Sequence, residues 1–388
     1  MHRSNAIIAF APTNSAPLQL PLMRIVDAPD ADVPLISLDQ ALDLLQDQVQ
    51  KILEAGHMRP GYSSTGIFDL AARRACGANL VDYFNNPADT LATLVRVLPY
   101  LPLAVQTQVK DYLTREEAAY PPYKYDHIGW RDGGGREAFD LPPEVEADRV
   151  NHSPQSGVSN FSGWSYSPYT FYGLWKYAQV FPDQAKALFD ASKSRLNPLP
   201  SDAVLLEMPH VHNAYIAGYW GYLELERMAG YPKTGKVRED LDHLLDLRVT
   251  QFSIELPEAF FPSRISPKAY CRSLSAARNF MYLTPELADY LKVYAYQQVK
   301  DGIEALIRVN PLWFVSKSET AFGEGVNNQM YDYNAIFQAK ALILGEPAED
   351  LGRYLDVPGF EVGDLFYIQN LISLIELMQV QELNTLIR

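Results

Sequence analysis

The stretch HVHNAYIAGYWGYLELERMAG, residues 210–230, contains a predicted helix that carries aromatic, small and apolar side chains on all sides. The stretch VREDLDHLLDLRV, residues 237–249, follows it and is more highly charged. A helix that is apolar all round is buried, whereas an amphipathic helix covers its neighbour. The sequence therefore predicts an inner helix over 212–229 and an outer helix over 236–250.

Helical periodicity continues through most of the chain. Residues 38–55 place leucine, isoleucine and valine side chains on one face, between a predicted N-cap at Ser37 and a stop at Gly56. Strand-like alternation is scarce, and the main ambiguous pieces are the stretch LLEMPHV, residues 205–211, and the segment around 251–262. Further helices are predicted over 67–84, 87–99, 102–119, 167–181, 183–195, 284–308, 328–344, 347–355 and 364–386. The pattern as a whole predicts an all-α protein.

Irregular inserts separate the predicted helix pairs, and no repeat signature is visible. Paired helices fit either an open α-solenoid or a closed α/α toroid of inner and outer helices, and the long inserts favour the toroid. The pattern over 38–386 resembles the α/α-toroid carbohydrate-active enzymes, which include the toroid polysaccharide lyases and the six-hairpin glycosidases. This resemblance implies one catalytic toroid domain over 38–388. The Pro- and Ala-rich residues 1–37 are interpreted as an extended N-terminal arm.

The composition excludes several classes of partner. The 388 residues have a formal net charge of −14, whereas nucleic acids and anionic membranes both require a basic footprint. No run of 18 apolar residues occurs, so no membrane-spanning helix is expected. The N-terminal AIIAFA is too short for a convincing signal peptide. We expect a secreted or periplasmic protein if a signal peptide is removed from the natural precursor, and a cytoplasmic protein otherwise.

The longest predicted non-helical insert, residues 120–166, is rich in aromatic side chains. Loops of this length in a compact domain are usually functional or disordered, and disordered segments are poor in aromatic residues. We interpret the insert as an ordered lid or cleft wall. Tyrosine, of which the chain has 24, combines a flat apolar face with a hydroxyl group, as sugar-binding clefts require. The candidates in this insert are catalytic His127 and substrate-binding Tyr125, Trp164 and Tyr166.

Polar residues gather where the inner helix over 212–229 is predicted to begin. Asn213 is a candidate N-cap, and a capped helix end with satisfied histidines is the structural interpretation. His210 and His212 have a spacing that can also bind a metal, but only Glu207 is an adjacent acid, and we expect no metal here. In a toroid this helix end would line the cleft. The resulting candidates are catalytic His212 and substrate-binding Asn213, Tyr215 and Trp220.

A second polar group occupies the stretch SETAFGEGVNNQMYDYNAIFQ, residues 318–338, just before and inside another predicted inner helix. Its structural interpretation is a glycine-rich turn with an asparagine cap. The stretch AYCRSLSAARNF, residues 269–280, adds arginines that either hold a substrate carboxylate or neutralise nearby acids. The candidates here are catalytic Tyr331 and Tyr333, and substrate-binding Asn327, Asn328 and Arg272.

These residue types favour a polysaccharide lyase that cleaves a uronic-acid-containing glycan by β-elimination. Such an enzyme removes the proton α to a uronate carboxyl group, so it needs a base, an acid and a group that neutralises the carboxylate. His212 with Tyr331 or Tyr333 supplies the base and the acid, while Asn213, Asn328 and Arg272 supply the neutralising groups. The expected partner is a polysaccharide or oligosaccharide, and no cofactor is expected.

Two alternatives stay open. A glycoside hydrolase in the same cleft would need two carboxyl groups across the scissile bond, and the sequence marks out no pair. The candidates for such a pair are Asp126, Asp132, Glu137, Glu207, Glu324 and Asp332. A non-catalytic helical protein could instead use the aromatic insert to bind a glycan or as a scaffold. The sequence is silent on oligomeric state.

Overall fold

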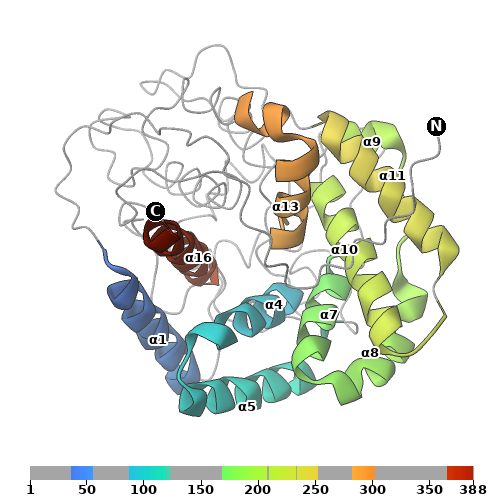
Figure 1. Ribbon diagram of the computed structural model, residues 1–388. Helices are drawn as coiled ribbons and strands as arrows, with labels where there is room; N and C mark the ends of the chain where they lie inside the picture. The colour runs from blue at the N-terminus through green and yellow to red at the C-terminus, as the bar shows by residue number, and fades with distance from the viewer. Residues whose placement is uncertain are drawn as a thin grey trace, which may run out of the picture.

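The computed structural model is described here for eight parts of the chain, in which every regular element is a helix (Figure 1). These parts are residues 36–55, 87–119, 121–122, 168–207, 209–232, 234–251, 282–301 and 365–387. The prediction of an all-α protein is confirmed for them. The arm predicted over 1–37 lies outside them except for its last two residues, and the insert over 120–166 except for 121–122. The helices predicted over 67–84, 328–344 and 347–355 also lie outside.

The predicted helices that the structure describes appear in the expected order, and one further helix, over 202–207, was not predicted. The α-helices are α1 (Leu38–Ala55), α4 (Pro87–Val97), α5 (Leu103–Ala119), α7 (Thr170–Val180), α8 (Ala185–Ser192), α9 (Asp202–Glu207), α10 (Pro209–Met228), α11 (Gly235–Gln251), α13 (Pro285–Tyr294) and α16 (Leu365–Ile387). Short 3₁₀ helices are η1 (Leu98–Tyr100), η4 (Pro182–Gln184) and η5 (Lys193–Arg195). None of the helices that the structure describes is long and apolar enough to cross a membrane.

Helix ends follow local rules with two differences from expectation. Ser37 caps α1 as predicted, because its hydroxyl accepts from the Gln40 backbone N–H and the Gln40 side chain accepts from the Ser37 N–H. The helix α10 begins at Pro209 rather than near residue 212. Proline suits the first turn of a helix, where its missing N–H leaves no bond unmade. The helix predicted over 284–308 is interrupted at Ala295, whose φ is −128°.

Consecutive helices pair as the alternation of apolar and charged segments predicted. The helix α10 buries most of its described residues, including the unbroken run 211–219, whereas α11 buries one face only. The helices α4 and α5, α7 and α8, and α10 and α11 pack against each other, and α11 lies outside α10. Within the inner layer α4 packs on α7, α7 on α10, and α10 on α13.

Glycines bring the inner helices into backbone contact. A Cβ atom on Gly221 would lie 2.5 Å from the backbone of Phe171, and one on Gly218 would lie 2.2 Å from the Pro168 carbonyl oxygen. Both contacts advance by three residues, so α7 and α10 run in the same direction. Gly173 brings α7 equally close to Ala88 of α4. The glycines of the quoted stretch thus serve helix packing.

The last described helix returns to the first. The helix α16 packs against both α1 and α4 (Figure 1). The Gln369 amide donates to Thr93 Oγ1 at 2.9 Å, and seven residues later Glu376 accepts from the Tyr100 hydroxyl at 3.2 Å. These contacts advance in the same direction on both elements, so α16 and α4 also run in the same direction. The last described helix therefore lies beside the first two described α-helices.

Candidate functional site

Four of the predicted site residues lie among the described residues, and all four are on α10. They are His212, Asn213, Tyr215 and Trp220. The other nine lie outside the described residues, and their roles stay predictions. They are His127, Tyr331, Tyr333, Tyr125, Trp164, Tyr166, Arg272, Asn327 and Asn328.

His212 is fully buried between α10 and α11. Its Nδ1 lies 2.7 Å from Gln251 Oε1, and its Nε2 lies 2.9 Å from the Leu244 carbonyl oxygen. The Gln251 amide nitrogen donates to the carbonyl oxygens of Leu205 and Leu206 at the end of α9. His212 and Gln251 therefore connect α9, α10 and α11. These contacts supply a structural role for His212, and its catalytic role stays a prediction.

The protonation of His212 is set by opposing effects. The pKa of His212 is lowered to about 4, chiefly by burial and also by the Arg248 charge, while the two oxygen contacts act to raise it. The neutral ring carries one N–H, so it can donate to only one of these two oxygen acceptors at a time. A ring held neutral and covered by protein is poorly suited to exchange protons with a substrate.

Asn213 lies inside α10 rather than at its end, so it is not the N-cap that the sequence suggested. Its Oδ1 accepts from Nε of the fully buried Arg248 at 2.8 Å. Burial lowers the pKa of Arg248 to about 9. An amide oxygen beside a buried guanidinium supplies the hydrogen bond that the charge requires. Asn213 thus joins His212 in a polar network between α10 and α11.

Tyr215 and Trp220 are packed into the protein rather than grouped around an opening. Tyr215 is buried, and burial raises its pKa to about 12. Trp220 is half-buried against the apolar core. Among the residues that the structure describes, no three His, Cys, Asp or Glu side chains are grouped so that they could hold a metal ion.

A second polar cluster lies between the inner helices, and sequence reasoning did not find it. On α7, the Tyr172 hydroxyl donates to Glu286 Oε2 at 2.9 Å, and the Lys176 ammonium pairs with Glu286 Oε1. Glu286 belongs to the first turn of α13. Lys176 Nζ also lies 4.0 Å from the ring centroid of Trp175. One cation, one carboxylate and two aromatic rings thus meet at the contact between α7 and α13.

The α4–α16 contact repeats this chemistry. Arg96 Nε donates to Glu376 Oε1 at 3.0 Å, and Nη2 pairs with Oε2, so the ion pair is bidentate. Nη2 also donates to Ser373 Oγ at 3.4 Å, and the Tyr100 hydroxyl donates to Glu376. We call the six residues of the two contacts the inner-helix cluster. They are Arg96, Tyr100, Tyr172, Lys176, Glu286 and Glu376.

Charges in the inner-helix cluster act on each other across both contacts. Burial raises the pKa of Tyr172, Glu286 raises it further, and the Arg96 charge lowers it. The pKa of Glu286 is lowered, because Lys176 outweighs the opposing effect of burial. The pKa of Arg96 is raised, since Glu376 outweighs burial. Glu286 and Arg96 are therefore charged at neutral pH, and the phenol of Tyr172 is neutral.

The sequence contained a weak sign of this cluster. Residues 167–181 were predicted as a helix, and the stretch TFYGLWKYAQV within it carries Lys176 among aromatic residues. A lone lysine on an otherwise apolar helix needs a partner or an exit to solvent. The partner, Glu286, is 110 residues away in sequence. No local pattern connects the two.

The chain has no detectable relative in the comparisons. It matches no protein-family model, no curated protein and no solved structure. The arrangement of its helices and the chemistry of its side chains are therefore the observations that bear on its function.

Proposed function

We propose that this protein is an α/α-toroid enzyme that degrades a polysaccharide, with β-elimination at a uronic acid residue as its reaction. The observation that carries the proposal is the contact of α16 with α1 and α4. In an open solenoid each repeat contacts only its neighbours, so the last helix would lie far from the first. Return of the last described helix to the first is what a closed toroid requires.

The directions of the helices support the same architecture. In a toroid of helical hairpins, every inner helix runs the same way and every outer helix runs back. The contacts of α7 with α10 and of α4 with α16 both advance in one direction. The helices α10 and α11 form an antiparallel hairpin, since His212 contacts Gln251 while Glu226 accepts from the Thr234 N–H at 2.9 Å. Fold alone does not define chemistry, so the reaction rests on the residues.

The proposed reaction needs groups at three atoms of the substrate. A base takes the proton from the carbon next to the uronate carboxylate, and the electron pair forms a carbon–carbon double bond. The bond from the neighbouring carbon to the glycosidic oxygen breaks, and an acid protonates that oxygen. We assign the base and the acid to His127 and to Tyr331 or Tyr333. Because His212 is buried with both nitrogens in contact with protein oxygens, we leave it out of these roles.

Substrate contacts in the proposal come from three groups of residues. Amide and guanidinium groups neutralise the carboxylate and lower the barrier to proton removal. Aromatic rings stack on sugar faces. The neutralising residues are Asn327, Asn328 and Arg272, and the stacking residues are Tyr125, Trp164 and Tyr166.

The experiment is a cleavage assay on alginate, pectate and glucuronan. Elimination produces an unsaturated uronate that absorbs ultraviolet light, and we expect this absorbance to rise with time for one of the polymers. Tyr331→Phe should lower the rate by about 100-fold or more, because it removes the proton that the phenol exchanges. Tyr294→Phe, on the half-exposed face of α13, is the matched control and should leave the rate unchanged.

Two outcomes would reject the lyase. New reducing ends without ultraviolet absorbance would identify a glycoside hydrolase. Binding of a glycan without any cleavage would identify a non-catalytic glycan-binding protein.

A further inference from the structure

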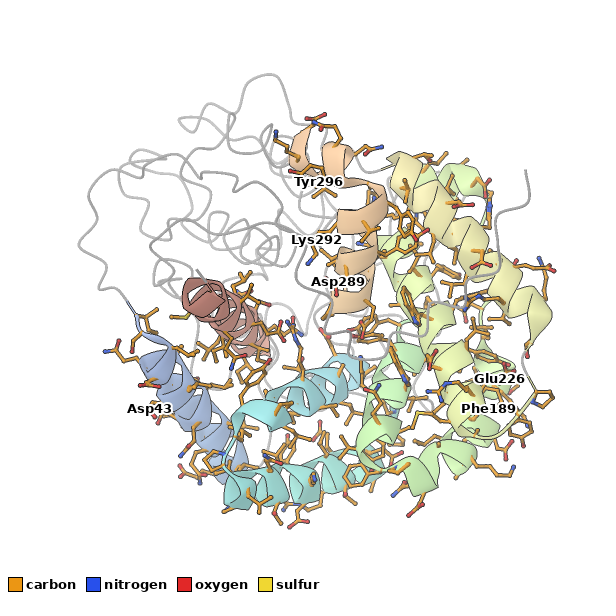
Figure 2. All side chains as sticks on the ribbon, in the orientation of Figure 1. Asp43, Phe189, Glu226, Asp289, Lys292 and Tyr296 are labelled. Carbon is orange, nitrogen blue, oxygen red and sulfur yellow. The ribbon has the colours of Figure 1, made fainter. Side chains whose placement is uncertain are left out.

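The inner-helix cluster differs from the ordinary ion pairs of this protein. Pairs such as Lys236–Asp240 and Lys292–Asp289 join residues three or four apart on one helix (Figure 2 labels Asp289 and Lys292). Such pairs within one helix contribute little to stability. The pairs Arg96–Glu376 and Lys176–Glu286 instead join helices that are 280 and 110 residues apart in sequence. The fold therefore gives each of these two cations an acidic partner from a distant part of the chain. Tyr172 lies close enough to Glu286 to donate to it, and close enough to Arg96 for the Arg96 charge to lower its pKa.

Both pairs are partly covered but still reach solvent. The side chains of Lys176 and Glu286 are 17% and 19% exposed, and those of Arg96 and Glu376 are 23% and 38% exposed. Partial desolvation strengthens a charge–charge interaction, whereas residual exposure leaves the charge open to a ligand. A group that served packing alone would gain by being apolar at such a position.

Aromatic rings flank both cations. Lys176 Nζ lies 4.0 Å from the Trp175 ring centroid and 5.2 Å from that of Tyr172. Tyr100 lies beside Glu376 and Arg96, and the Arg96 charge acts on Tyr172. Cations beside flat apolar rings and hydroxyl groups are the combination that an acidic sugar needs, because its ring stacks while its carboxylate pairs.

We propose that Arg96 and Lys176 bind the carboxylate groups of an acidic glycan, and that Glu376 and Glu286 hold the two cations in place between binding events. This inference rests on the proposed function and deepens it, because it identifies which described residues meet a uronate chain. The net charge of −14 makes general attraction of a polyanion unfavourable. Binding of an acidic glycan would therefore depend on the local positive charges of Arg96 and Lys176.

The proposal predicts opposite effects on ligand affinity for substitutions of the cations and of the glutamates. Neutralising a cation removes a partner of the ligand, so its affinity should fall. Neutralising a glutamate removes an internal carboxylate that competes with the ligand for the same cation, so the affinity should rise. A cluster that only stabilises the fold would give no gain in affinity from either change.

The test measures binding of alginate, pectate and glucuronan tetrasaccharides by isothermal titration calorimetry. Arg96→Gln and Lys176→Gln should each weaken the best of these ligands by about tenfold or more, as expected for loss of a charge-assisted contact. Glu286→Gln and Glu376→Gln should each tighten it by about threefold or more. Lys236→Gln, which changes an exposed pair on α11, is the control and should leave affinity unchanged.

A second ligand and a stability measurement complete the design. The same tetrasaccharide with its carboxyl groups reduced to alcohols has no carboxylate for Lys176 to bind. Its affinity for the wild type should therefore be no higher than its affinity for the Lys176→Gln variant. Thermal unfolding identifies any variant that loses its fold, and the glutamate variants still decide the result if a cation variant is unfolded.

Three results would overturn the inference. They are unchanged affinity in folded cation variants, weaker binding in both folded glutamate variants, and equal wild-type affinity for the acidic and the reduced ligand. The cleavage assay decides the proposed function separately, since unsaturated products from a wild type that fails this binding test would keep the lyase while rejecting these two residues.

Discussion

At the scale of single residues, His212 illustrates how burial changes the meaning of a polar side chain. It stands in a stretch of polar groups before an apolar helix, yet it contacts only protein atoms on α10 and α11. Arg248 and His243 are the charged or titratable groups that act on it from α11, and both lower its pKa. The contacts of His212 join helices, so a change in its protonation should change the stability of the fold.

Stability should depend on the protonation of His212. Its pKa is about 4 in the folded protein and near its ordinary 6.5 in the unfolded chain, so the unfolded chain binds the proton first as the pH falls. Stability is therefore fully present above about pH 6.5 and is lost between pH 6.5 and 4. We expect the loss from pH 7 to pH 5 to be about 2 kcal/mol from this group. Urea unfolding at several pH values measures it.

The comparison with His212→Gln isolates this contribution from the titration of carboxylates. The difference in unfolding free energy between wild type and variant should shrink as the pH falls. The prediction is contradicted if the difference in unfolding free energy between wild type and His212→Gln stays constant from pH 7 to pH 5.

At the scale of elements, the inner helices depend on close backbone approach. Gly218 and Gly221 of α10 face the start of α7, and Gly173 of α7 faces Ala88 of α4. Rings then fill the space beside these contacts, as where Phe171 meets Tyr222 with centroids 5.2 Å apart. Small and aromatic residues on one helix are thus complementary parts of a single packing scheme.

Substitution of Gly221 by alanine should separate α7 from α10. The new Cβ would lie 2.5 Å from backbone atoms of Phe171 and Tyr172, which cannot turn aside as a side chain can. We expect a loss of at least about 2 kcal/mol in unfolding free energy, measured by urea denaturation. Gly235→Ala is the control, because its Cβ would meet nothing within 4 Å and alanine favours the helix. Equal stability of the two variants would show that α7 and α10 are not in backbone contact.

At the scale of the whole molecule, α16 places the C-terminal end of the described helices beside their N-terminal end. Its buried residues include Leu371, Ile372, Leu374 and Ile375. It packs against α1 and α4, which lie more than 250 residues earlier in the chain. The stability of the first helix should therefore depend on the last one.

Hydrogen exchange can test this dependence. Leu371→Ala removes a fully buried side chain from α16 and should lower stability by about 2–5 kcal/mol. Because α1 packs on α16, its amide protection should fall more than that of α11, which lies among other helices. Leu188→Ala on α8 is the matched control and should affect α10 more than α1. A loss of protection confined to α16 and its sequence neighbours would indicate an open array.

Local pattern was sufficient for the helices but not for the site. Apolar periodicity and the N-cap at Ser37 predicted α1, and the contrast between the segments at 210–230 and 237–249 predicted which helix is inner. The start of α10 was misplaced, because polar residues in its first turns were taken to precede the helix. Polar residues such as Asn213 occur both at helix ends and in buried hydrogen-bond networks, and the sequence alone did not show which applied here.

The sequence by itself determined that the parts of the chain the structure describes are helical, in which order most of these helices follow and which of them are buried. Those properties depend on residues three or four positions apart, so they are written in local periodicity. Only the tertiary structure decided that His212 meets Gln251, that Asn213 meets Arg248, and that Arg96 and Lys176 gather acidic partners from α16 and α13. These contacts join residues 35 to 280 positions apart. Each depends on how whole helices pack, and packing is a property of the assembled core rather than of any segment.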